Sequence, residues 1–154
     1  MKGKNNLFSY SNNIAKGDIS FMPKEGERSL FAKYIANRAD IDPNGMYDIV
    51  AHGNSDLIEI ENGNTTIKIT AREAAKLIRK QPGFKNAKSI RLFSCNTGST
   101  INGFAQNLAN ALGKPVYAPN MTIYSNNRGN YCISNGINRG EFIKIIPGGY
   151  KNGK

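Results

Sequence analysis

Apolar residues recur along this chain with two different periods, which predict strands and helices in alternation. Apolar runs of strand length occupy residues 18–22, 46–52, 89–94 and 116–118. Apolar residues at helical spacing occupy residues 30–38, 71–81 and 101–112. Alternation of this kind predicts an α/β fold in which helices flank a mostly parallel central sheet.

Turn residues and capping signals organise the rest of the chain. The turn Asn62-Gly63-Asn64 separates two alternating stretches, 57–61 and 65–70, which predicts a β-hairpin inserted after the strand 46–52. Thr70 and Glu73 have the spacing of a capping box at the start of the helix 71–81. Toward the C-terminus, short β-type runs predict antiparallel strands at 122–124, 131–134 and 141–146.

The length and apolar content are those of one domain, because 154 residues with 39% hydrophobic content can build a single core. We therefore expect one domain over residues 1–154, with residues 1–17 poorly ordered. No apolar run approaches the length that spans a bilayer. Met1–Asn6 is not followed by the apolar core of a signal peptide, so we expect no membrane span and no export signal in this chain.

Basic residues outnumber acidic residues by 21 to 11, which gives a net charge of +10. Such a charge favours nucleic acid, acidic proteins or anionic membrane surfaces as partners. The densest basic group consists of Lys76, Arg79, Lys80, Lys85 and Lys88. Without a nucleic-acid motif or interleaved aromatic residues, such a group is usually a solvated helix face. Both interpretations, a solvated helix face and a nucleic-acid-binding surface, stay open.

The two cysteines, Cys95 and Cys132, could form at most one disulfide, which is not the density of a secreted disulfide scaffold. A reducing compartment suits them better. Cys132 is predicted to be a buried strand residue. One histidine, two separated cysteines and no clustered carboxylates offer no set of zinc ligands, so we expect no metal and no other cofactor.

Two apolar strands end next to reactive side chains. The strand 46–52 ends at His52, the only histidine, and the strand 89–94 is followed by Cys95, 43 residues after His52. The carboxyl ends of neighbouring parallel strands lie about 5 Å apart, so His52 and Cys95 could exchange a proton directly or through water. Because a free cysteine is mostly protonated at neutral pH, the pair predicts a thiol nucleophile with an acid/base partner.

Small residues follow both reactive side chains. Gly53 leaves room for a substrate carbonyl, and its backbone amide is predicted to form an oxyanion hole with the amide of Cys95. A helix that starts near Ile101 would add weak positive potential favouring a thiolate. Ser55 and Asp56 could bond His52 or orient the loop, and a polar entry to the hairpin explains them equally well. The predicted substrate loop consists of Asn54, Ser55, Asn96, Thr97 and Gly98.

The His52-Gly53 pair, followed by a strand that leads to Cys95, resembles the caspase-like cysteine peptidases of clan CD. These include caspases, gingipains, clostripain and the autoprocessing domains of large bacterial toxins. The resemblance implies that His52 is the general acid/base, Cys95 the nucleophile, and the amides of Gly53 and Cys95 the oxyanion donors. The run Ser94-Cys95-Asn96-Thr97-Gly98 lacks the caspase Gln-Ala-Cys pattern, so cleavage after Asp is not implied.

A closer resemblance covers residues 43–120. The runs at 48–53, 90–98, 103–109 and 115–119 are similar to C-terminal toxin domains of bacterial polymorphic and contact-dependent toxins. This resemblance implies a domain that a larger secreted or cell-surface protein delivers into the cytoplasm of a competing cell. It also implies a protein or peptide substrate and a cognate immunity protein.

Two other functions stay open. The net charge and the abundance of nucleases among such toxins leave room for a basic RNase, in which His52 would act with a nearby Lys or Arg and without Cys95. A non-catalytic binding module on the same fold is the other alternative, because a fold does not establish a function. A cysteine at the end of an apolar strand is more often inert than reactive. The reactivity of Cys95 therefore distinguishes the peptidase from the RNase and the binding module.

Overall fold

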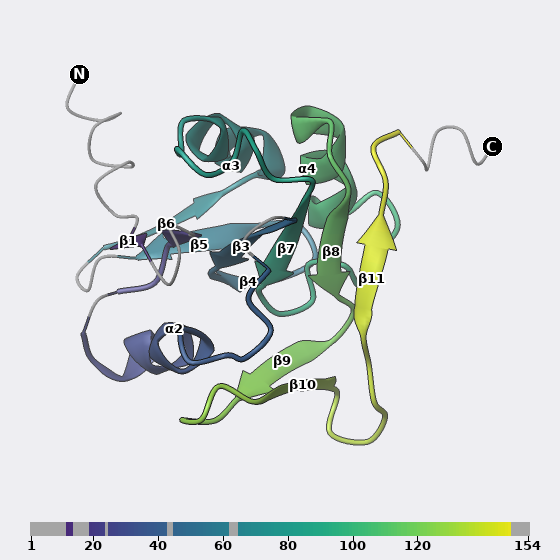
Figure 1. The fold of residues 1–154 in the computed structure, drawn as a ribbon. Helices are drawn as coiled ribbons and strands as arrows, with labels where there is room; N and C mark the ends of the chain where they lie inside the picture. Colours follow the sequence, from purple (N-terminus) through teal and green to yellow (C-terminus); the bar gives the residue numbers. More distant parts are fainter. Residues whose placement is uncertain (1–11, 14–18, 24, 43–44, 62–64, 149–154) are drawn as a thin grey trace.

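A six-stranded sheet runs through the molecule and is covered on both faces (Figure 1). This computed structural model describes residues 12–13, 19–23, 25–42, 45–61 and 65–148. In spatial order, the strands of the sheet are β1 (Asn12–Asn13), β2 (Ile19–Ser20), β3 (Met46–Val50), β7 (Ser89–Phe93), β8 (Val116–Pro119) and β11 (Phe142–Ile145). The expectation of poor order for residues 1–17 lies outside the described residues, apart from β1.

The four inner strands of the sheet are parallel, which confirms the predicted α/β class. β2 pairs with β3, β3 with β7 and β7 with β8 in parallel, whereas β1 and β11 are antiparallel edge strands. All five residues of β7 are buried, as is typical of a strand that is covered on both faces. The sheet is therefore mixed but mostly parallel, with antiparallel strands toward the C-terminus.

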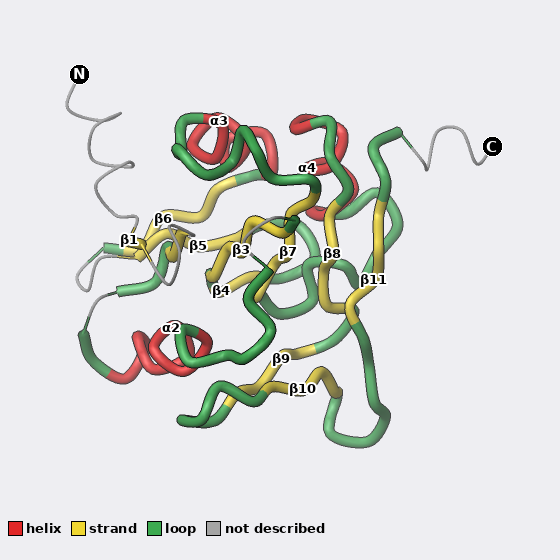
Figure 2. Tube along the Cα trace, viewed as in Figure 1, coloured by secondary structure: helices red, strands yellow, loops and turns green. Residues whose placement is uncertain are grey.

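Two helices lie on one face of the sheet, and a helix with a β-ribbon lies on the other (Figure 2). We call the first the α3/α4 face; it carries α3 (Ala71–Arg79) and α4 (Phe104–Leu112). The opposite α2 face carries η2 (Glu27–Ser29), α2 (Leu30–Ile35), β9 (Thr122–Ser125) and β10 (Tyr131–Ser134). In the described part of the chain, no helix is long and apolar enough to cross a membrane.

The predicted hairpin after β3 is present, but it belongs to a separate three-stranded sheet. Its strands are β4 (His52–Gly53), β5 (Ile58–Glu61) and β6 (Thr66–Ile69), all antiparallel. The predicted turn at residues 62–64 lies outside the described residues. The single strand expected over 46–52 is therefore wrong in extent, because His52 leaves β3 and pairs with Glu59 of β5.

The two helix starts on the α3/α4 face differ in how well the sequence predicts them. The capping box at the start of α3 is confirmed, since the Thr70 hydroxyl accepts from the Glu73 amide and the Glu73 carboxylate accepts from the Thr70 amide. The helix expected from Ile101 begins only at Phe104. Ile101 is 76% exposed and Asn102 has a φ of 64°, so neither continues the apolar face of α4.

Candidate active site

The register of β3 and β7 brings the ends that precede His52 and Cys95 together. The paired residues run from Met46 with Ser89 to Val50 with Phe93, and every pair is 43 residues apart. His52 and Cys95 have the same separation, and each lies two residues beyond the last pair. The two side chains therefore leave adjacent strands at equivalent positions of one sheet edge.

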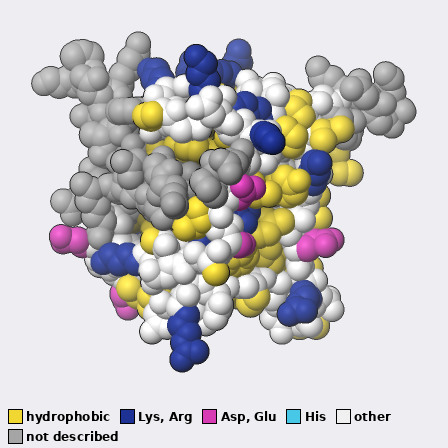
Figure 3. All heavy atoms as spheres, in the orientation of Figure 1, with side chains coloured by type: hydrophobic (Ala, Val, Ile, Leu, Met, Phe, Trp, Pro, Cys, Tyr) yellow, Lys and Arg dark blue, Asp and Glu magenta, His cyan; other side chains and the backbone are white. Residues whose placement is uncertain are grey.

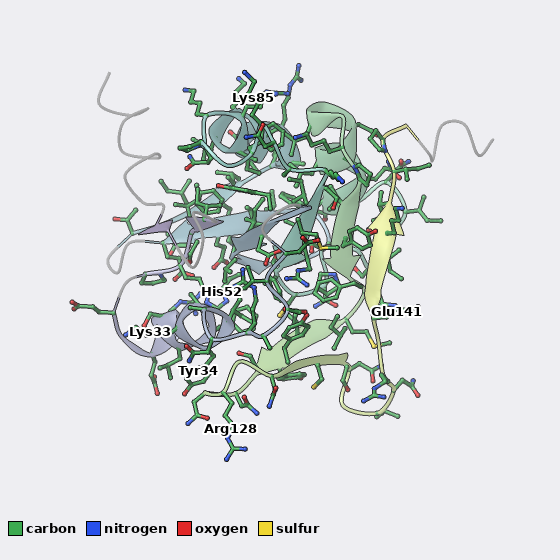
Figure 4. The ribbon with its side chains drawn as sticks, in the orientation of Figure 1. Lys33, Tyr34, His52, Lys85, Arg128 and Glu141 are labelled. Atoms are coloured by element: carbon green, nitrogen blue, oxygen red, sulfur yellow. The ribbon has the colours of Figure 1, made fainter. Side chains whose placement is uncertain are left out.

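Side-chain alternation places both residues on the α2 face. Val50 and Phe93 are buried in the smaller apolar cluster on that face, and Cys95 packs against this cluster. Ile49 and Ala51 belong to the larger cluster on the α3/α4 face. Glu59, the strand partner of His52, lies between Ile58 and Ile60 of the larger cluster, so His52 faces away from that cluster, and Figure 4 shows it between the sheet and α2.

His52 faces a buried carboxylate. Its imidazole Nε2 lies 3.6 Å from Oε2 of Glu61, and its side chain is 32% exposed. Nε2 itself is buried and has no hydrogen-bond partner among the described residues. The residue that faces the histidine is therefore Glu61 of β5, in place of the expected Ser55 or Asp56.

Glu61 is held from behind by an arginine of η2. Arg28 donates from Nε to Oε1 of Glu61 at 2.5 Å and from Nη2 to Oε2 at 2.9 Å. The Glu61 side chain is only 4% exposed, and its hydrogen bond raises the pKa of Arg28. Arg28 also contacts Glu59 at 3.2 Å. A paired guanidinium thus keeps the buried carboxylate compensated and fixed beneath His52.

Cys95 is a free, half-buried thiol that points to a backbone carbonyl. Its Sγ lies 3.9 Å from the carbonyl oxygen of Ile123 in β9. Within the described chain, no hydrogen bond joins the thiol to His52. Cys132 is also free, but it is exposed, so the prediction of a buried strand residue is wrong. Tyr131 and Ile133 pack inward from β10, and Cys132 opposite Tyr124 faces outward.

The backbone amide of Gly53 is not used by the hairpin. Asn54 donates its amide to the Leu57 carbonyl at 3.0 Å, which makes residues 54 and 57 a hydrogen-bonded pair. By the alternation of an antiparallel ladder, Gly53 and Ile58 form a non-hydrogen-bonded pair, so the Gly53 amide points away from β5. A side chain on Gly53 would meet Thr97 Cγ2 at 3.0 Å, so a residue larger than glycine would press against the loop after Cys95.

Four of the five residues of the predicted substrate loop are held in place by the following hydrogen bonds. Asn54 accepts from the amides of residues 56 and 57 through its side chain. Asn96 has a φ of 60° and donates its amide to the Met121 carbonyl. Thr97 is buried and donates its hydroxyl to the Ser94 carbonyl. Gly98 donates its amide to Pro119. The loops on either side of Cys95 are therefore fixed by hydrogen bonds.

The first amides of α4 are also taken by these loops. Phe104 donates to the Ser55 carbonyl at 2.7 Å, and Ala105 donates to the Thr97 carbonyl at 3.1 Å. The predicted positive potential from a helix that starts near Ile101 is therefore absent at that position. The helix starts three residues later, and its leading N–H groups point at carbonyl oxygens of the two loops.

A buried network of charges lies under the site on the α2 face. Asp48 of β3 accepts from Arg38 at 2.8 Å and from two nitrogens of Arg91 at 2.9 and 2.8 Å. Arg91 also bonds Asp40 at 3.0 Å, and the Tyr131 hydroxyl donates to Asp40. Asp48 is thus structural: it ties β3 to β7 just before the residues that lead to His52 and Cys95.

Sequence reasoning missed Glu61 and Arg28. In the alternating run Ile58-Glu59-Ile60-Glu61, both glutamates occupy positions that usually face solvent in a two-sided hairpin. Glu61 is buried because β5 lies against the segment after β2, where the Glu61 amide donates to the Phe21 carbonyl at 2.8 Å. Arg28 lies 33 residues away in the sequence, so no local pattern links the two.

The chain belongs to the family described as a domain of unknown function (DUF8616), which matches residues 17–133. The chain is also similar to the uncharacterized protein YibJ of Escherichia coli (strain K12), with 32% identity over 98 residues. That match covers 49% of this chain and 42% of YibJ, so it spans less than half the length of this relative. No solved structure matches the chain significantly.

Proposed function

We propose that this family member is a caspase-like cysteine peptidase in which Cys95 is the nucleophile and His52 the general acid/base. The observation that carries the proposal is the shared register, because His52 and Cys95 each follow the last paired residues of two adjacent parallel strands by two positions. Parallel-strand ends are where α/β proteins build sites, and nucleophilic catalysis by a thiol needs an acid/base partner within reach.

The proposed reaction proceeds through an acyl-enzyme. His52 removes the Cys95 proton, and the thiolate attacks the substrate carbonyl to form a tetrahedral oxyanion. The Gly53 amide, which points away from β5, donates a hydrogen bond to that oxyanion together with the Cys95 amide. The protonated His52 then gives its proton to the leaving amine, and water activated by the neutral imidazole releases the acid product.

Glu61 is proposed as a positioning residue for His52. With Nε2 at the carboxylate, the other ring nitrogen, Nδ1, is left to exchange the proton with Cys95 and the leaving group. Arg28 keeps the carboxylate in place through two hydrogen bonds. The Cys95 thiol, which donates to the Ile123 carbonyl in the resting protein, turns toward the histidine when a substrate enters.

The biological setting is proposed from the sequence resemblance over residues 43–120. The domain would be delivered from a larger secreted or cell-surface protein into the cytoplasm of a competing bacterium, with a protein or peptide as substrate. A cognate immunity protein would neutralise it. In this setting, Cys95→Ala and His52→Ala are each expected to abolish toxicity when the domain is expressed in bacteria, and unchanged toxicity in both variants would contradict the proposal.

The sharpest test is the rate of alkylation of Cys95 by iodoacetamide as a function of pH. Because Cys132 is exposed and would react as well, the measurement is made in a Cys132→Ser background. We expect rapid labelling below pH 7 that is lost in His52→Ala and slowed in Glu61→Gln. Circular dichroism shows whether the variants keep the fold. If alkylation is slow and follows the pH dependence of an ordinary thiol in the Cys132→Ser parent and in both variants, the peptidase proposal is contradicted. A binding module or a different chemistry would then remain.

A basic RNase is the second candidate, favoured by the net charge of +10. It would use His52 and a cationic side chain, and it would not need the thiol. Toxicity that survives Cys95→Ser and is accompanied by degradation of cellular RNA would favour this function over the peptidase.

A further inference from the structure

The positive charge of this protein is concentrated in one segment. Residues 65–88 contain seven Lys and Arg side chains and one acidic residue, Glu73. In the rest of the chain, 14 basic residues face 10 acidic residues. The segment therefore accounts for more than half of the net charge, although it forms less than a sixth of the chain.

All seven basic side chains of this segment are exposed. Figure 3 shows Lys and Arg side chains gathered over α3, and Figure 4 places Lys85 on that side, away from Arg128 at the opposite end of the view. Glu73 does not balance them, because its carboxylate is occupied by the amide and hydroxyl of Thr70. We call this surface the basic face; it consists of Lys68, Arg72, Lys76, Arg79, Lys80, Lys85 and Lys88.

The loop that extends the basic face beyond α3 is held in shape. Lys114 donates to the carbonyls of Phe84 at 2.7 Å and Ala87 at 2.6 Å, and its ammonium lies 4.0 Å from the centre of the Phe84 ring. Arg79 is anchored to the Ala111 carbonyl at 2.7 Å. Lys85 is therefore carried on a fixed loop beside the helix, which lowers the entropy cost of binding a ligand there.

An open cavity of about 480 Å³, with a largely apolar lining that carries a few polar side chains, adjoins the basic face at the start of α3. Its lining combines α3 with α4 and the turn after β4, and it includes Arg72 from the basic face itself. Side-chain amides and guanidinium groups of this kind are the groups that read the edges of nucleobases. The lining residues are Asp56, Thr70, Ala71, Arg72, Asn107, Asn110 and Ala111.

The composition of the basic face argues against a protein partner. Stable protein interfaces have an apolar or aromatic centre, with charged residues depleted from it. Among the described residues, the exposed large apolar side chains are Leu30, Ile101, Tyr124, Ile137 and Ile146, and none belongs to α3 or the loop after it. A row of cations with a spacing of about 6 Å between positions i and i+4 on a helix instead suits a chain of phosphates.

From these observations, we infer that the basic face binds the backbone of a single-stranded nucleic acid and that the adjoining cavity accepts an unstacked base. The cations neutralise successive phosphates, and Arg72 lies at the junction between the two parts. A single strand is required because the bases of a duplex are stacked and cannot enter a cavity. This inference does not depend on the thiol chemistry of Cys95.

The test is the fluorescence anisotropy of labelled 12-nucleotide DNA and RNA single strands with the whole chain. If four phosphates are neutralised, affinity is expected to fall about fifty-fold between 50 and 200 mM salt. At 150 mM salt, where distant charges are screened, Lys76→Glu is expected to lower affinity at least about fivefold. The matched control, Lys33→Glu on α2, makes the same charge change on the opposite face and is expected to stay within about twofold.

Three further probes separate the alternatives. Asn107→Ala is expected to weaken oligonucleotide binding several-fold and to leave the binding of inorganic polyphosphate unchanged. Polyglutamate that binds as tightly as the oligonucleotides would overturn the inference in favour of an acidic protein. Tighter binding of duplex DNA, or equal losses in Lys76→Glu and Lys33→Glu, would overturn it as well.

Discussion

On the α3/α4 face of the sheet the buried side chains are almost all apolar, whereas on the α2 face several charged side chains are buried beside Phe93. Two neighbours in β3 show the contrast. Ile49 is fully buried in the larger apolar cluster, and Asp48, with a side chain 1% exposed, binds two arginines on the other side. The guanidinium of Arg91 also lies 4.8 Å from the centre of the Phe93 ring.

The contrast shows that stability and geometry are supplied from different faces. Apolar burial is non-directional and stabilises any close packing, whereas a buried ion network is satisfied in one arrangement only. Arg38 binds Asp48 and the Ile35 carbonyl, so it ties α2 to β3. Arg91 binds Asp48 and Asp40, so it ties β7 to the segment after α2. The α2 face, which carries the candidate site, is thus the face whose charged side chains fix the relative positions of the elements.

The largest expected effect comes from Asp48→Ala. This change leaves Arg38 and Arg91 buried near an absent carboxylate, and it is expected to lower the free energy of unfolding by about 3–5 kcal/mol. Guanidinium unfolding followed by circular dichroism measures the loss.

The matched control for Asp48→Ala is Ile49→Ala, the next residue of β3, whose side chain lies on the α3/α4 face. The cavity left there is expected to cost about 2–5 kcal/mol. Replacing Arg38, Asp48 and Arg91 together by apolar residues of similar size should restore most of the stability, because Asp40, which loses Arg91, is about half exposed and no buried charge is left unpaired. If the triple variant were as unstable as Asp48→Ala, charge burial would not be the cause.

A smaller effect is expected from Thr70→Ala, which removes the capping box that starts α3 on the apolar face. Loss of an N-cap side chain is expected to cost about 1 kcal/mol in urea unfolding. Thr66→Ala, at an exposed position of β6, serves as the control and should change stability by less than about 0.5 kcal/mol. Equal effects at both positions would argue against the cap.

The last expected effect is confined to alkaline solution and concerns Tyr131 on the α2 face. Burial, together with the hydrogen bond to Asp40, raises the pKa of Tyr131 to about 12. An unfolded tyrosine titrates near pH 10, so the folded protein holds this proton more tightly. The stability that results is present in full below about pH 10 and is lost as the pH rises toward 12.

The difference in unfolding free energy between the wild type and Tyr131→Phe is the measurement for this prediction. It should be constant from about pH 7 to 9 and should shift against the wild type between about pH 10 and 12. If this difference in unfolding free energy does not change with pH over the whole range, the titration of Tyr131 makes no contribution to stability.

The fold could be predicted where local signals and packing agree. The apolar runs of β7 and the capping box of α3 identify their elements directly, because burial on both faces and a reciprocal cap each leave a pattern in the sequence. The end of β3 and the start of α4 were predicted with the wrong bounds. His52 exchanges one strand partner for another, and Ile101 is an exposed apolar residue that imitates helical spacing.

His52 and Cys95 could be proposed as site residues from the sequence, whereas the side chains that contact His52 could not. His52 and Cys95 follow apolar strands at a fixed separation, which is readable in one sequence. The contact between His52 and Glu61, and that between Arg28 and Glu61, depend on how β5 folds back beside the segment after β2. Such contacts are set by tertiary packing, so no spacing rule within a single strand reports them.

The hydrogen bonds at the start of α4 have a consequence for motion. Two consecutive amides, those of Phe104 and Ala105, hold the loop after His52 and the loop after Cys95, respectively. Neither loop can move outward without breaking a bond to the same helical turn, so the two loops are mechanically coupled. The amide protons of Phe104 and Ala105 should therefore exchange with solvent in a single opening event, at a common rate set by how often the helix end frays.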